Sequence, residues 1–195
     1  MDKKSKALNQ IKEQTVTYEV YAAMPDDGQR YEIVDGSMEM MSPSPTATHQ
    51  AVNRELEYKL MQSCKADYLI YDAPLDVILS ETDVLQPDIM MIHRSRQHIV
   101  TNRGIEGPPD LVVEILSLSS RKRDKVIKMR TYAKFGVQEY WIVDADTRTL
   151  EQFQHVEGER YELINLFEGN ELVTSDKLPC VSYAISDIFR EIREV

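Results

Sequence analysis

The sequence of 195 residues has few of the residues that stabilise extracellular proteins or anchor membrane proteins. Its two cysteines, Cys64 and Cys180, have no Cys or His nearby at the spacing of a zinc site, so we expect reduced thiols in a cytoplasmic protein. No apolar run approaches the ~20 residues of a membrane-spanning helix. Residues 1–14 are polar and basic, without the apolar stretch of a secretory signal. We therefore expect neither secretion nor a membrane partner.

Aromatic residues are also scarce, at 8% of the chain, with one Trp and four Phe. A glycosidase with two catalytic carboxylates needs an aromatic platform for the sugar, so that class is the weakest candidate. Apolar residues make up 42% and charged residues 29%, which is the composition of a globular domain. A chain of this length buries enough surface to fold without disulfide or metal.

Positive charge is in short supply, since 23 Lys and Arg stand against 33 Asp and Glu and the formal net charge is −10. Such a balance disfavours nucleic-acid binding, in which phosphate contacts dominate. Residues 111–150 are the exception, because they carry 8 Lys and Arg against 5 Asp and Glu. An anion-binding surface is therefore expected in this stretch.

The pattern of apolar and turn residues predicts one mixed α/β domain over residues 16–195, behind a flexible lead-in over residues 1–15. Asp35-Gly36 predicts a hairpin between strands 30–34 and 37–41. We expect a short helix after Thr17 and main helices over 46–63 and from Ser119 or Ser120 to Phe135. Further strands are expected over residues 68–71, 75–79, 88–92, 111–116, 139–143, 149–155 and 161–164, and a short helix over 185–192. The result is a sheet flanked by two main helices.

Two acids lie in strands that are otherwise apolar. Glu114 stands within Leu111–Leu116, where an ionised carboxylate is costly unless a cation or several hydrogen bonds compensate it. Asp88 follows Pro87 and opens a similar apolar run. If the two strands are adjacent, their carboxylates converge and can hold Mg²⁺ or Mn²⁺. The structural alternatives are a salt bridge for Glu114 and a strand-start turn for Asp88.

The basic stretch opens the second main helix with six cations and one acid over residues 119–130. Arg121, Lys122 and Arg123 stand where a helix N-terminus favours an anion, which suits a phosphate ligand. The alternative is a solvated helix face. Asp124 and Lys128 are four residues apart and can form an ion pair within the helix.

Two further residues have plain structural interpretations. Glu32 alternates with apolar neighbours in the first hairpin strand, and period-2 patterning predicts that it faces solvent. His49, near the start of the first main helix, is expected to cap or pack rather than to bind a ligand.

Three segments in this order resemble the Uma2 family (DUF820), whose members have the PD-(D/E)XK restriction-endonuclease-like core. They are RYEIVDGSMEMMSPSPTATHQ at 30–50, QPDIMMI at 86–92, and PDLVVEILSLSSRKRDKVIKMRTYAKFGVQEYWIVD at 109–144. The resemblance covers about residues 16–190. It implies a metal-dependent endonuclease that hydrolyses phosphodiester bonds of nucleic acid, DNA in the first place.

The resemblance also implies roles for single residues. Asp88, Glu114 and the backbone carbonyl of Ile115 would hold Mg²⁺ or Mn²⁺, with Glu32 as a supporting ligand. The superfamily lysine would stand two residues after the second acid, where this chain has Leu116, and Lys128 is the match on the following helix. Arg121, Lys122 and Arg123 would contact phosphates, while His49 and Asp124 would support the site.

A rival hypothesis keeps the fold and discards the chemistry. A net charge of −10 repels DNA outside the basic stretch, which favours a catalytically silent nuclease-fold protein that binds nucleic acid or assembles with other proteins. The resemblance further implies a homodimer, and strands 149–155 and 161–164 have the patterning of sheet edges that could mediate it.

Overall fold

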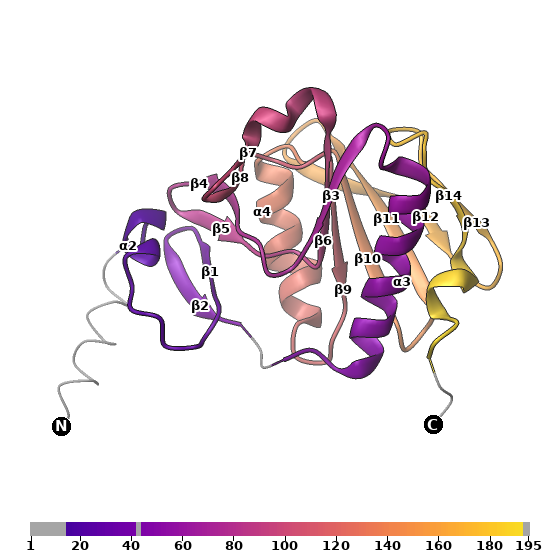
Figure 1. The fold of residues 1–195 in the computed structure, drawn as a ribbon, viewed down its shortest axis with the longest axis horizontal. Coiled ribbons are helices and arrows are strands. Elements are labelled where there is room, and N and C mark those ends of the chain that lie inside the picture. Colours follow the sequence, from indigo (N-terminus) through magenta and orange to yellow (C-terminus); the bar gives the residue numbers. More distant parts are fainter. Residues whose placement is uncertain (1–14, 42–43, 193–195) are drawn as a thin grey trace.

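The computed structural model describes residues 15–41 and 44–192, so the expected lead-in lies almost wholly outside the described residues. The strands form two six-stranded sheets and a small two-stranded one (Figure 1). In spatial order the first sheet contains β2 (Ser37–Met40), β1 (Tyr31–Val34), β5 (Asp83–Leu85), β4 (Val77–Ser80), β8 (Gly104–Glu106) and β7 (Val100–Thr101). The second contains β12 (Arg160–Phe167), β11 (Thr149–Val156), β10 (Glu139–Asp144), β9 (Leu111–Ile115), β6 (Ile89–His93) and β3 (Tyr68–Asp72). The third pairs β13 (Leu172–Thr174) with β14 (Ser182–Ala184).

The helical elements are α2 (Tyr18–Ala22), α3 (Ala47–Cys64), the 3₁₀ segments η1 (Arg94–Ile99) and η3 (Ile185–Phe189), and a helix made of the π-helical η2 (Arg123–Lys128) followed by α4 (Met129–Lys134). Thr17 caps α2 as predicted, with its Oγ1 accepting from Val20 N, and Thr46 caps α3 in the same way with its Oγ1 accepting from His49 N. The second main helix begins at Arg121, directly after Ser120, as predicted. Ser117 adds a hydrogen bond in the turn before it, with its hydroxyl accepting from Ser120 N.

The second sheet is covered on both faces (Figure 1). On one face, α3 and η3 pack against the odd-numbered side chains of β9 in the larger core cluster. On the other, Tyr132 of α4 packs against Val112 and Leu116, together with Leu85 of the first sheet. Because β9 is buried on both faces, its sequence reads as a continuous apolar run. The even-numbered face, which carries Glu114, therefore looks toward the helix of η2 and α4.

The hairpin and the sheet flanked by helices confirm the predicted mixed architecture. Asp35 and Gly36 both have positive φ, 48° and 74°, as the tight turn between β1 and β2 requires. The hairpin does not stand alone, however, because Ile33 of β1 pairs with Val84 of β5 and extends the first sheet. The short strands β5, β7, β8, β13 and β14 were not predicted, since two or three residues carry too little periodicity.

The edge assignment for the second sheet needs a correction. Strand β11 pairs with β10 on one side and β12 on the other, so it is internal. Only β12, of the two strands proposed as edges, lies at the rim. Its side chains Leu163, Ile164 and Leu166 are 53%, 45% and 50% exposed.

The cysteines also differ from expectation, because Cys64 and Cys180 form a disulfide. The last turn of α3 lies beside the segment that precedes β14, with the two Cα atoms 5.1 Å apart. The expectation of reduced thiols was wrong because a separation of 116 residues leaves no local pattern that reveals the contact. Among the described residues, no helix is long and apolar enough to cross a membrane. The cytoplasmic location stays a prediction.

Candidate active site

Of the two acids singled out in the sequence, Glu114 lies in β9 and Asp88 directly precedes the neighbouring strand β6. Strands β6 and β9 are antiparallel partners, and the register that pairs Ile89 with Val113 brings the preceding Asp88 opposite Glu114. Asp88 Oδ2 accepts a hydrogen bond from the backbone N–H of Ile115 at 2.7 Å. The adjacency on which the convergence of the two carboxylates depends is therefore present.

Lys128 is the centre of the cluster. Its Nζ lies 2.9 Å from both carboxylate oxygens of Glu114 and 3.0 Å from Glu32 Oε1. It also lies 3.6 Å from Asp124 Oδ1, so the ion pair predicted from the helical spacing is present. All four residues are less than 5% exposed. One ammonium therefore joins a strand of each sheet to the helix between them.

The π-helical segment η2 brings three charged side chains of one helix into this cluster. Met129 N donates to Asp124 O, five residues back, and the Tyr140 hydroxyl donates to the same carbonyl at 2.9 Å. The wider turn brings Arg123 to the site together with Asp124 and Lys128, and π turns of this kind recur at functional sites. Arg123 contacts Glu32 Oε2 at 2.7 Å and Glu39 at 2.6 Å, which fixes the β1–β2 hairpin to the helix.

The prediction that Glu32 faces solvent is wrong. The residue is instead 1% exposed, because η2 covers its face of β1. Besides Lys128 and Arg123, its Oε1 accepts from the backbone N–H of Gln86 at 2.9 Å. Alternation along a strand separates two faces, but it does not tell which of them a distant helix covers.

His49 adds a group on the side of Asp88. Its Nε2 lies 3.2 Å from Asp88 Oδ2, and its side chain is 12% exposed. Burial would lower the pKa of His49, but the Asp88 carboxylate and the Ile115 carbonyl outweigh burial and raise the pKa. His49 therefore packs, as expected, and its neighbour is Asp88, one of the predicted metal ligands.

Carboxylates outnumber cations at this site. Burial raises the pKa of Glu114 well above its ordinary value, and the opposing effect of Lys128 does not cancel it. Burial also raises the pKa of Asp124. Burial by itself would lower the pKa of Lys128, yet Glu114, Glu32 and Asp124 reverse this, and its pKa is raised. Lys128 therefore stays protonated, and the acids remain short of positive charge.

A divalent cation such as Mg²⁺ would need oxygen ligands from this cluster. Among the described residues, no three or more His, Cys, Asp and Glu side chains are grouped to hold a metal ion. Mg²⁺, however, commonly takes only one or two protein carboxylates and completes its shell with water and substrate phosphate. Asp88, Glu114 and the carbonyl of Ile115 are oxygen donors in a cluster in which acids outnumber cations, so they fit such an ion.

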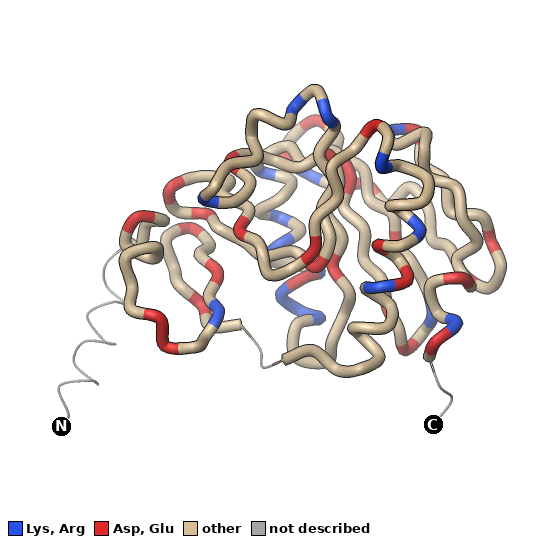
Figure 2. Tube along the Cα trace, viewed as in Figure 1, with Lys and Arg blue, Asp and Glu red and all other residues tan. Residues whose placement is uncertain are grey.

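Other predicted residues lie outside the contacts of this cluster. Arg121 pairs with Asp144 at 2.7 Å and Asp146 at 3.6 Å, at the end of β10. Lys122 is exposed. Figure 2 shows Lys and Arg in blue along the helix of η2 and α4, with acidic positions in red on the segments around it. The basic stretch is thus partly neutralised by the protein's own carboxylates.

Sequence reasoning missed two residues of the site. The Tyr132 hydroxyl donates to Glu114 Oε1 at 3.3 Å, and Gln86 supplies its backbone N–H to Glu32. Tyr132 could have been found, because residues four apart share a helix face and it follows Asp124 and Lys128 at that spacing. Gln86 carried no signal, since a backbone donor leaves no trace in side-chain chemistry.

The chain is similar to one protein family and to solved nuclease structures. Residues 18–186 match the family model Uma2, described as "Putative restriction endonuclease". The crystal structure of a putative nuclease belonging to DUF820 from Anabaena variabilis ATCC 29413 superposes with a TM-score of 0.72 at 21% identity, covering 90% of this chain and 98% of that one. The type IIG restriction endonuclease BpuSI gives a TM-score of 0.42 at 12% identity over 77% of this chain and 16% of that one, and no argument rests on it. No curated protein matches the sequence.

Proposed function

Because the chain belongs to the Uma2 family, we propose that it is a metal-dependent nuclease that hydrolyses phosphodiester bonds, with DNA as the first substrate to test. The observation that carries the proposal is the meeting of Asp88, Glu114 and Lys128, which come from three elements and share one buried, acid-rich site. Glu114 and Lys128 both have a raised pKa, and shifted pKa values in neighbouring titratable groups are more typical of a functional site than of a core.

Asp88, Glu114 and the carbonyl of Ile115 would hold Mg²⁺ or Mn²⁺. A bound ion of this kind polarises a phosphate and lowers the pKa of an attacking water. Lys128, held protonated by the surrounding carboxylates, would orient that water or stabilise charge on the phosphate oxygens. Glu32 would keep Lys128 in position through its 3.0 Å contact.

The remaining residues would support binding. His49 would hold the Asp88 carboxylate in one orientation, since its ring nitrogen lies 3.2 Å from Oδ2. Exposed Lys122, with Arg121 and Arg123, would contact phosphates without reading sequence. Arg121 and Arg123 already pair with acids, so substrate phosphates would have to compete for them.

The experiment is a Mn²⁺ and Mg²⁺ titration by isothermal calorimetry with wild type, Asp88→Asn and Glu114→Gln. Glu151→Gln is the matched control, because it removes one carboxylate that pairs with Lys125, outside the cluster. We expect binding in wild type and control, and loss in both site variants. Equal binding by all four proteins would remove the proposed metal site.

One observation favours the alternative of a catalytically silent binding module. Lys128 contacts both oxygens of Glu114, and the pair is nearly inaccessible to solvent. A silent protein would bind nucleic acid without metal, so filter binding in EDTA separates the two functions. Retained binding in EDTA together with no cleavage in Mn²⁺ would favour the module.

We also propose that the chain forms a homodimer through β12. This strand lies at the rim of the second sheet and exposes Leu163, Ile164 and Leu166. An unpaired apolar edge strand is a template for pairing with another copy. Light scattering after size exclusion should give twice the 22.6 kDa chain mass. Monomer mass for wild type, or an unchanged dimer for Leu163→Lys, would contradict this interface.

A further inference from the structure

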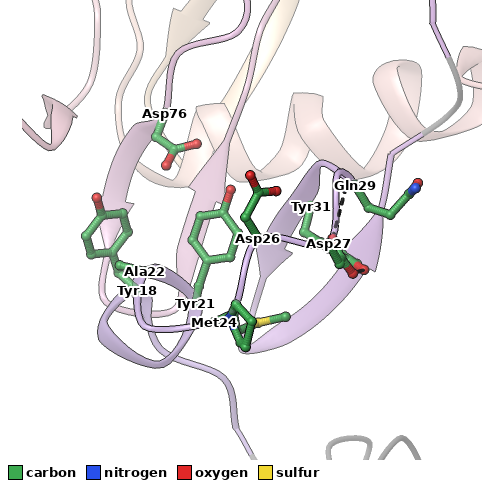
Figure 3. A pocket seen from close by; sticks show the side chains of 10 residues that line it. Tyr18, Tyr21, Ala22, Met24, Asp26, Asp27, Gln29, Tyr31 and Asp76 are labelled. Atoms are coloured by element: carbon green, nitrogen blue, oxygen red, sulfur yellow. Dashed lines mark hydrogen bonds between the residues drawn. The ribbon is translucent and has the colours of Figure 1, made fainter.

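A cavity lies outside the acid cluster, between α2, the loop that follows it and the start of β4 (Figure 3). The cavity has a volume of about 290 Å³. Its polar lining consists of Tyr18, Tyr21, Asp26, Asp27, Gln29, Tyr31 and Asp76. We call it the α2 pocket. Its size is at the lower end of ligand sites, which suits a group the size of one side chain.

The lining of the α2 pocket has one sign of charge. Three aspartates line it, and no Lys, Arg or His does. Figure 3 shows Tyr18 and Tyr21 extending from α2 toward Asp76, with Asp26 beside Tyr21. Carboxylates and aromatic faces on one cavity are the two features that attract an organic cation.

The aromatic wall already accepts a cation from within the protein. The guanidinium carbon of Arg103 lies 4.4 Å from the centroid of the Tyr18 ring. Arg103 also contacts Glu106, and it does not line the pocket. Tyr21 meets Tyr18 edge to face at 6.2 Å, so the two rings form one wall. This wall is therefore chemically suited to a second guanidinium or ammonium group.

Asp76 lacks a cationic partner among the described residues. Its Oδ1 accepts from Gln86 Nε2 at 2.8 Å, and it has no ion pair there. Burial raises the pKa of Asp76, with Gln86 opposing and the charge of Glu32 adding to the rise. A cation in the pocket would compensate this carboxylate.

Gln86, which hydrogen-bonds Asp76 but does not line the pocket itself, has a polar atom without a partner among the residues that the structure describes. It is 7% exposed, and its Oε1 is buried without a hydrogen-bond partner in the described part of the chain. Its side chain lies between Asp76 and Tyr21, both of which line the pocket. A buried amide oxygen without a donor is costly, and this one belongs to the residue that holds Asp76 of the pocket wall.

We propose that the α2 pocket binds one organic cation, an ammonium or guanidinium group of the size of a Lys or Arg side chain. Binding of the cation does not require the proposed nuclease activity. The two sites are nevertheless neighbours, because the Gln86 side chain donates to Asp76 and its backbone N–H donates to Glu32.

The test is a titration of the ¹⁵N-labelled full chain, followed by amide chemical shifts, with N-acetyl-arginine amide, N-acetyl-lysine amide and butylguanidinium. N-acetyl-citrulline amide is the neutral isostere of the first probe. The variants are Asp76→Asn, which keeps an acceptor for Gln86, and Glu19→Gln, which removes an exposed charge of α2 outside the pocket.

We expect saturable shifts centred on Tyr21 and Asp76 for the cations and none for citrulline. Asp76→Asn should weaken binding at least about tenfold, as expected for loss of a hydrogen bond to a charged group, and Glu19→Gln should not. Tighter binding of the capped amino acids than of butylguanidinium would identify a peptide side chain as the source, and the reverse would identify a free small organic cation. Equal binding of citrulline, or an unchanged affinity in Asp76→Asn, would overturn the proposal.

Discussion

Removing the Lys128 ammonium is the sharpest perturbation of the acid cluster. In Lys128→Met, a side chain of similar length replaces it, and Glu114, Glu32 and Asp124 lose a cation that lies within 3.6 Å of each. Removing one partner of a buried pair typically costs about 3–5 kcal/mol. That is a large part of the ~5–15 kcal/mol that stabilises a domain. In a chain of this size it corresponds to a fall of roughly 6–20 °C in Tm.

The loss of stability in Lys128→Met should also depend on pH, in a direction that the pKa of Glu114 determines. Without Lys128, the pKa of Glu114, already raised by burial, rises further. A carboxyl whose folded pKa lies above the unfolded value of about 4.3 loses stability as pH rises through that interval. The destabilisation by Lys128→Met should therefore be larger at about pH 8 than at about pH 5.

The assay is urea unfolding followed by circular dichroism at both pH values. Lys125→Met is the control, because its pair with Glu151 is partly exposed and worth at most about 1 kcal/mol. If Lys128→Met unfolds at the same urea concentration as Lys125→Met, the buried ammonium does not hold the cluster together, and the reasoning fails.

Three further perturbations probe other parts of the molecule. Arg123→Met releases β1–β2 from η2 and should cost about 1–3 kcal/mol, with faster hydrogen exchange confined to the hairpin; uniform exchange rates would contradict the contact to Glu32. Glu139→Ala leaves the buried Trp141 indole N–H, now 2.8 Å from Glu139, without its acceptor and should cost about 2–4 kcal/mol in urea unfolding; a cost below that of Lys125→Met would show that this hydrogen bond is dispensable. Reduction of the Cys64–Cys180 disulfide opens a loop of 116 residues and should lower the free energy of unfolding by up to about 5 kcal/mol; two thiols titrating in the native, unreduced protein would show that the bond is not there.

The sequence singled out two acids of the candidate site because a charge in or beside an apolar strand is conspicuous. Glu114 interrupts such a run and Asp88 opens one, while the helical spacing of Asp124 and Lys128 predicted their ion pair. Long periodic elements such as α3 and β11 were also predictable, with ends displaced by only a residue or two.

What the sequence could not predict depends on contacts between distant segments. Glu32 looked exposed because nothing local shows that η2 covers β1. The pairing of Cys64 with Cys180 and the placement of Gln86 between two sites arise from the same cause. The π turn at η2 was likewise not predicted, and one of its carbonyls, that of Asp124, also accepts from the Tyr140 hydroxyl of the distant strand β10.

Whether Asp88 and Glu114 are catalytic is decided by cleavage of plasmid DNA in Mn²⁺, with wild type, Asp88→Ala, Glu114→Ala and Glu151→Gln purified in parallel. We expect wild type and Glu151→Gln to nick the plasmid in Mn²⁺ and not in EDTA. We expect both site variants to remain folded by circular dichroism and to leave the plasmid intact. Cleavage at the wild-type rate by folded Asp88→Ala or Glu114→Ala would contradict the assignment of these carboxylates to catalysis.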